Sequence, residues 1–167
     1  MRAVRLWSVR HSHGLMKLYD VFEGLIMAVE PVVRRVGYDR LEKPVSVVEN
    51  GIKSAMFDCQ MCGQCALSST GMSCPMNCPK NLRNGPCGGV RENGHCEVKP
   101  DMPCVWVKAW EGSKDMSNGN ILDVQRPVDH RMKGTSSWLR LMRQKKDGTY
   151  PRPATSARGD AGGSITR

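Results

Sequence analysis

The chain has 167 residues, which is enough for one domain with a modest hydrophobic core. Aromatic residues make up only 5% of the sequence, and 17 glycines and 10 prolines indicate many loops, so metals or crosslinks are expected to add stability. The net charge of +9 is concentrated towards the C-terminus, and neither a secretory signal nor an apolar stretch of membrane-spanning length is visible, which predicts a cytoplasmic protein without membrane contact.

Five consecutive segments are predicted along the chain. Helical spacing precedes the first cysteine, whereas glycine, proline and asparagine dominate the cysteine-rich part. We therefore predict one small domain, mainly α with long irregular Cys-rich loops, stabilised by metal clusters. The predicted segments are an N-terminal arm (1–13), a helical segment (14–56), a Cys-rich metal-cluster domain (57–112), a C-terminal extension with a short basic helix (113–146) and a disordered tail (147–167).

The clearest helical pattern begins after Gly14. Its apolar residues at alternating steps of four and three are Leu18, Phe22, Leu25, Val29, Val32 and Val36. This spacing predicts one face of a helix, with a kink or a division into two helices at Pro31. We expect this face to pack on the protein's own core; the alternative is that it docks on a partner.

Three shorter elements follow. Residues 44–59 have helical spacing that a turn at Asn50-Gly51 is expected to interrupt. The stretch CVWVKAWEGS (104–113) predicts a short strand or helix; in a helix, Trp106 and Trp110 would share a face. The stretch SSWLRLMRQK (136–145) predicts a short basic helix.

Eight cysteines lie within 46 consecutive residues, a density typical of metal or disulfide sites. They are Cys59, Cys62, Cys65, Cys74, Cys78, Cys87, Cys96 and Cys104. A reducing compartment favours metal ligation over disulfides. The triple spacing Cys59-x2-Cys62-x2-Cys65 is that of bacterial ferredoxins, and Gly63 leaves room beside a cluster. Cysteine pairs also fit structural zinc, so both metals stay open, with iron–sulfur favoured.

The glycine-rich loop NGPCGG (84–89) surrounds Cys87 with residues that tolerate unusual backbone angles. Such a loop can direct amide N–H groups at cluster sulfurs. The sequence contains neither a phosphate-binding loop nor a set of nucleophile, base and orienting acid, so no catalytic residue is predicted. In redox chemistry such a chain would carry electrons while a partner makes and breaks bonds.

The stretches CPKNLRNGPCGG (78–89) and CEVKPDMPCVW (96–106) resemble the C-terminal domain family of methylenetetrahydrofolate reductase. In two-subunit bacterial enzymes of this kind the family forms a small subunit beside a flavin-bearing barrel. The resemblance implies two 4Fe–4S clusters held by the eight cysteines, and a partner that binds FMN or FAD and interconverts methylene- and methyl-tetrahydrofolate. We expect Cys59, Cys62 and Cys65 to share a cluster, with Cys78 or Cys104 as the fourth ligand.

The predicted function is thus that of a non-catalytic electron-transfer subunit of the flavin-dependent reductase. The alternative is a zinc-stabilised structural subunit that shapes the reductase; one cluster plus one zinc is also open. The basic C-terminus suggests docking of an acidic electron carrier such as a ferredoxin or flavodoxin. Trp106 and Trp110 are expected in the core, with a cluster–flavin contact as the alternative. Nucleic-acid binding is not expected, because the cysteine region is neutral.

Overall fold

The computed structural model describes residues 2–116, 121–124 and 128–150. Within these ranges the chain is mainly helical in one small domain, as predicted, and its only extended pairings are two isolated β-bridges. No helix in the described part of the chain is long and apolar enough to cross a membrane. The helices are α1 (Arg2–Arg10), α2 (Ser12–Val36), α3 (Tyr38–Phe57), α4 (Val105–Lys114) and α5 (Ser137–Lys146), with single turns of 3-10 helix at η1 (Pro75–Asn77), η2 (Ile121–Val124) and η3 (His130–Met132).

Stabilisation by metal clusters remains a prediction. The cysteine-rich part is irregular, as expected, and apart from η1 it runs as loops between α3 and α4. Of the predicted disordered tail, residues 151–167 lie outside the described ranges. The residues just before them are bound to α5, because the amides of Thr149 and Tyr150 donate to the Gln144 carbonyl at 2.9 and 3.0 Å.

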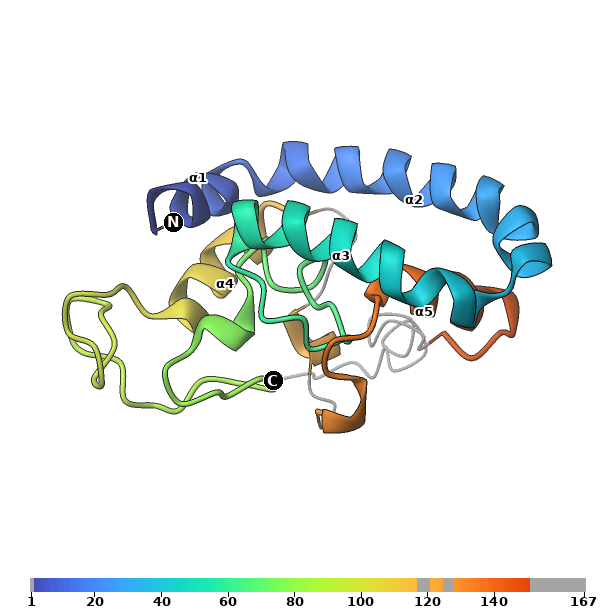
Figure 1. Ribbon diagram of the computed structural model, residues 1–167. Coiled ribbons are helices and arrows are strands. Elements are labelled where there is room, and N and C mark those ends of the chain that lie inside the picture. Colours follow the sequence, from blue (N-terminus) through green and yellow to red (C-terminus); the bar gives the residue numbers. More distant parts are fainter. Residues whose placement is uncertain (1, 117–120, 125–127, 151–167) are drawn as a thin grey trace, which may run out of the picture.

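Helices α2 and α3 run antiparallel and are joined at Gly37 (Figure 1). The expected division at Pro31 is absent, since α2 continues through it, and the expected turn at Asn50-Gly51 is absent from α3. A proline removes one helical hydrogen bond, which buried neighbours such as Val33 offset by packing against α5. The break falls instead at Gly37, whose φ of +100° favours glycine.

Helix α5 lies against α2 and α3 and completes the largest apolar cluster. The helix matches the predicted short basic one, and the Ser136 hydroxyl caps it by accepting from the Leu139 amide at 3.2 Å. Its apolar side bears Leu139, Leu141 and Met142, which pack with the α2 side chains Ile26 and Val33. The C-terminal extension is therefore part of the core.

The predicted apolar stripe of α2 does not pack on this core. Leu18 is 63% exposed, Leu25 62% and Val32 60%, and of the six predicted residues only Phe22 is partly buried. The buried side of α2 carries Met16, Ile26 and Val33 instead. The expectation of own-core packing was wrong because α2 has two apolar sides, and only one of them meets the rest of the domain.

The predicted N-terminal arm is helix α1, which packs against α3 and α4. Two buried serine hydroxyls fix the junction: Ser8 donates to the Met56 carbonyl at 3.3 Å, and Ser12 donates to the Gly112 carbonyl of α4 at 3.1 Å. The 104–113 segment is thus a helix, and its two tryptophans differ. Trp106 is buried and donates to the Leu82 carbonyl at 3.0 Å, whereas Trp110 is 53% exposed, so the core role is confirmed only for Trp106.

Candidate metal centre

Four of the eight cysteines line one pocket, which we call the thiol pocket. They are Cys59, Cys62, Cys65 and Cys74. The first three come from the triple turn that follows α3, and the fourth comes from the loop before η1. The expected fourth partners, Cys78 and Cys104, lie instead in an apolar cluster with Trp106. All eight cysteines are free thiols.

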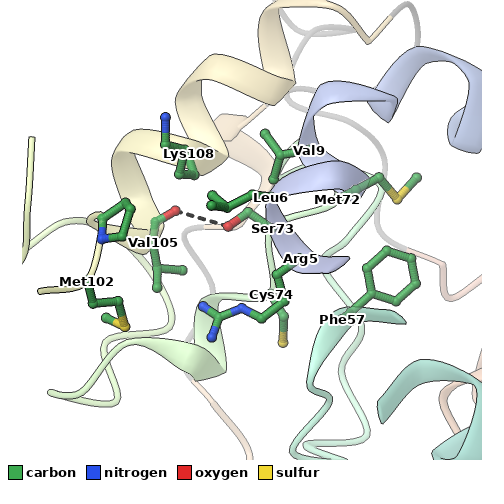
Figure 2. Close-up of a pocket in the computed structure, with 11 residues that line it drawn as sticks. Arg5, Leu6, Val9, Phe57, Met72, Ser73, Cys74, Met102, Val105 and Lys108 are labelled. Carbon is green, nitrogen blue, oxygen red and sulfur yellow. Dashed lines mark hydrogen bonds between the residues drawn. The ribbon is translucent and has the colours of Figure 1, made fainter. Parts of the chain in front are cut away.

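Cys74 occupies a position between two pockets. Figure 2 shows the second one, lined by α1, α4 and the loop that carries Ser73 and Cys74. The Ser73 hydroxyl donates to the Val105 carbonyl at 3.1 Å, which ties this loop to the start of α4. The anchored loop holds Cys74 against Phe57, at the end of α3, and thereby close to the triple turn.

The pocket thiols oppose one another's ionisation. Burial, and next the neighbouring Cys59, raise the pKa of the Cys74 thiol to about 12. Burial also raises the pKa of Cys59, and the nearby Cys65 adds to this effect. Several thiolates become stable at such a place only when a positive group offsets their charge, as bound metal ions do.

Backbone amides donate to three cysteine sulfurs, each from the residue two positions further on. The Met61 amide lies 3.4 Å from Cys59 Sγ, and the Gly89 amide lies 3.3 Å from Cys87 Sγ. The Met76 amide hydrogen-bonds to Cys74 and lowers its pKa against the effect of burial. Such bonds favour the thiolate and raise the reduction potential of iron–sulfur centres. The predicted ability of the 84–89 loop to direct amides at sulfur is seen at Gly89.

A buried ion pair forms one wall of the thiol pocket. Glu49 and Lys53 are one turn apart on α3, and their side chains are only 2% and 6% exposed. Lys53 Nζ lies 2.6 Å from Glu49 Oε1 and 2.7 Å from Ser137 Oγ. Burial disfavours the ammonium, but Cys65 and Glu49 outweigh it and raise the pKa of Lys53. Lys53 therefore remains a positive charge beside the thiols.

Glu49 in turn binds the start of α5. Its carboxylate accepts hydrogen bonds from the hydroxyls of Ser136 and Ser137 at 2.6 and 2.5 Å. It also accepts from the amides of Ser137 and Trp138 at 3.2 and 3.3 Å. Burial favours the protonated acid, yet Lys53 and these hydroxyls more than offset it and lower the pKa of Glu49. A helix N-terminus further stabilises this negative charge.

Two arginines reach the backbone of the triple turn. Arg83 Nη2 donates to the Gln64 carbonyl at 2.6 Å, and Arg140 Nη1 donates to the Gly63 carbonyl at 3.2 Å. The Nε of Arg83 is buried and has no hydrogen-bond partner in the described part of the chain. The sequence did not indicate these cations, because their basic residues come from three distant segments. The Glu49/Lys53 spacing was visible, but it usually marks an exposed helix pair.

The segment before α5 clamps the triple turn. The Gly134 amide donates to the Met61 carbonyl at 2.7 Å, and Gln64 Nε2 donates to the Asp129 carbonyl at 3.1 Å. A Cβ at Gly63 would overlap the Met132 carbonyl and the Thr135 hydroxyl. Gly63 therefore makes room for this clamp, whereas the sequence suggested room for a cluster.

We expect Gly63→Ala to destabilise the protein by more than about 2 kcal/mol. The new Cβ would collide with the clamp backbone, and alanine would be strained at the φ of +70°. Gly148→Ala is the matched control, because Gly148 has a φ of +67° and open space around its Cβ position. Urea unfolding of both variants measures the difference. Equal losses of stability would show that the clamp contact contributes nothing.

The other four cysteines lie beyond the thiol pocket. Cys78 and Cys104 are buried in one apolar cluster, and Cys96 is buried beside Met102. Cys87 is exposed, with its sulfur 3.7 Å from Glu97 Oε1. Glu97 pairs with Lys80, whose charge acts on both Cys87 and Cys96. The structure thus associates these cysteines in two pairs, and their role as ligands stays a prediction.

The residues of the thiol pocket fit a cluster better than a single ion. Within the described residues, no three His, Cys, Asp or Glu side chains are gathered closely enough to bind one metal ion as they stand. Zinc draws four sulfurs to about 2.3 Å from one point. A 4Fe–4S cluster binds each thiolate to a different iron, so its ligands stand further apart. Four thiols around one pocket, with an ammonium in its wall, match the donors and the charge of such an anionic cluster.

Comparison with known proteins gives one match. The family model described as methylene-tetrahydrofolate reductase C terminal matches residues 38–131. This range is more than half of the chain and contains α3, all eight cysteines and α4, whereas α1, α2 and α5 lie outside it. No curated protein and no solved structure matches the chain.

Proposed function

The chain belongs to the methylene-tetrahydrofolate reductase C-terminal family, and from this membership we propose that it is the electron-transfer iron–sulfur subunit of such a reductase. In this proposal a partner subunit binds FMN or FAD and interconverts methylene- and methyl-tetrahydrofolate. The chain described here performs no bond chemistry. It holds iron–sulfur clusters that connect the flavin to an external electron donor or acceptor.

The observation that carries the proposal is the thiol pocket. Cys59, Cys62, Cys65 and Cys74 supply four sulfurs, the number that a 4Fe–4S cluster requires. A bound cluster would accept and release single electrons. Lys53 would offset its negative charge, and the Met61 and Met76 amides would bind ligating sulfurs, so both features favour the reduced state.

We place a second cluster on the remaining cysteines, Cys78, Cys87, Cys96 and Cys104. Two observations support this set: the apolar contact that joins Cys78 to Cys104, and the charge of Lys80, which reaches both Cys87 and Cys96. Burial of three of these thiols would limit water access to such a cluster.

Metal analysis of anaerobically purified protein tests the proposal. We expect a brown protein with about eight iron and eight sulfide per chain, since each of two 4Fe–4S clusters holds four of each. The protein should also bind a flavin-containing reductase subunit from the same organism. A colourless protein with stoichiometric zinc would contradict electron transfer and favour the zinc-stabilised structural subunit.

A further inference from the structure

Helix α2 presents an apolar surface to solvent along most of its length. We define this surface, the α2 stripe, as Leu18, Val21, Leu25, Val29, Val32 and Val36, which are between 43% and 71% exposed. Eighteen residues separate its ends, so it is about 27 Å long at 1.5 Å per residue. The helix that carries it lies along the outer edge of the molecule (Figure 1).

The α2 stripe is separate from the side that holds α2 in the domain. At about 100° per residue, its members centre roughly 120° around the helix from the buried Met16, Ile26 and Val33. The core contacts of α2 are therefore made without the stripe. Contiguous apolar surface of this length on a folded domain marks a contact site for another molecule.

The charges beside the α2 stripe disfavour a second copy of this chain. Lys17 and Arg35 are exposed and five full turns apart, so they lie along the same flank of the stripe. The stripe is nearly symmetric about Met27, and a second copy packed antiparallel would bring Lys17 of one chain beside Arg35 of the other. Parallel packing would bring each residue beside its own copy. Both arrangements place like charges together.

The same charges fit an acidic partner. Beyond Arg35, the C-terminal end of α2 and the start of α3 expose Arg34, Arg40 and Lys43, against Asp39 as the only exposed acid in 34–43. An apolar ridge bordered by bases is complementary to an apolar groove bordered by acids. The stripe also lies outside the family match, which begins at residue 38, so it is a feature of this chain in addition to the shared region.

We propose that the α2 stripe docks the flavin-binding reductase subunit, in an apolar groove of that subunit with an acidic border. This inference rests on the proposed function, which supplies the partner. The position is suitable for electron transfer, because Tyr19, on the inner side of α2, is partly buried and within electrostatic range of Cys65. One helix layer of about 10 Å thus separates the docked subunit from the thiol pocket.

Binding of the full-length, cluster-loaded chain to the purified reductase subunit tests this inference. Leu25→Asp/Val32→Asp changes two side chains that are about 60% exposed, so iron content and helicity should not change. We expect its Kd to rise at least 100-fold. Val4→Asp is the control, because Val4 is 41% exposed on α1 and should bind as wild type. Lys17→Glu/Arg35→Glu should slow association and flatten its salt dependence.

Three outcomes would overturn the inference. In the first, Leu25→Asp/Val32→Asp binds as tightly as wild type with full iron content; this leaves the proposed function intact. In the second, light scattering shows that the wild-type chain alone is a dimer and that the variant is a monomer, which assigns the stripe to a second copy. In the third, the iron-loaded wild type does not bind the reductase subunit, which overturns the proposed partner as well.

Discussion

Cys74→Ser should lower the iron content from about eight to about four per chain, although the sequence motif of three closely spaced cysteines ends at Cys65. The expectation follows from the thiol pocket, where Cys74 faces the triple turn and shares its electrostatic environment. A serine hydroxyl is a poor ligand for iron in such a site, and four thiolates are needed for each 4Fe–4S cluster. Iron and sulfide analysis of anaerobically purified variants measures the loss.

Double variants show which cysteines share a cluster. If Cys59 and Cys74 hold the same cluster, Cys59→Ser/Cys74→Ser should lose no more iron than either single change. Cys74→Ser/Cys78→Ser should lose nearly all of it, because the second change removes a ligand of the other proposed cluster. The reverse pattern, with Cys74 additive to Cys59 and not to Cys78, would restore Cys78 as the fourth ligand of the triple turn.

The helical class was predictable because α2 and α5 carry strong local periodicity. The break between α2 and α3 was not, because proline and Asn-Gly are local signals that packing can override. Gly37 stops the helix through its φ, whereas Pro31 is held by buried neighbours on both sides. The exposure of the α2 stripe was unpredictable for a related reason: periodicity shows that a face is apolar, and only the tertiary arrangement shows what covers it.

The metal ligands were predictable as a set and not in their grouping. Spacing of two residues joins Cys59, Cys62 and Cys65 through local geometry, whereas Cys74 reaches them only because Ser73 ties its loop to α4. The charged wall was hidden for the same reason. Lys53 lies on a helix before the motif, and the serines that order its partner Glu49 come more than 80 residues later. Contacts of such sequence separation leave no local pattern.

Removing the charge of Glu49 should be among the most costly single changes in this domain. We expect Glu49→Gln to lower the free energy of unfolding by about 3 to 5 kcal/mol, since it leaves the buried Lys53 ammonium without its counter-ion. Lys53→Met should cost about half as much, because the Glu49 carboxylate keeps its bonds from Ser136, Ser137 and Trp138. The double variant should cost less than the sum of the two single changes. Urea unfolding of metal-free protein at pH 7 measures all three.

The pH dependence follows from the lowered pKa of Glu49 in the folded state. A carboxyl whose pKa is depressed by folding stabilises the protein above its unfolded pKa, about 4.3, and this contribution is lost as the pH falls below that value. Lys53→Met removes the main group that lowers this pKa. Its acid-unfolding midpoint should therefore move to higher pH than that of wild type, whereas Lys53→Arg should stay close to wild type. An unchanged midpoint in Lys53→Met would show that the serine hydroxyls and the α5 N-terminus alone keep Glu49 ionised.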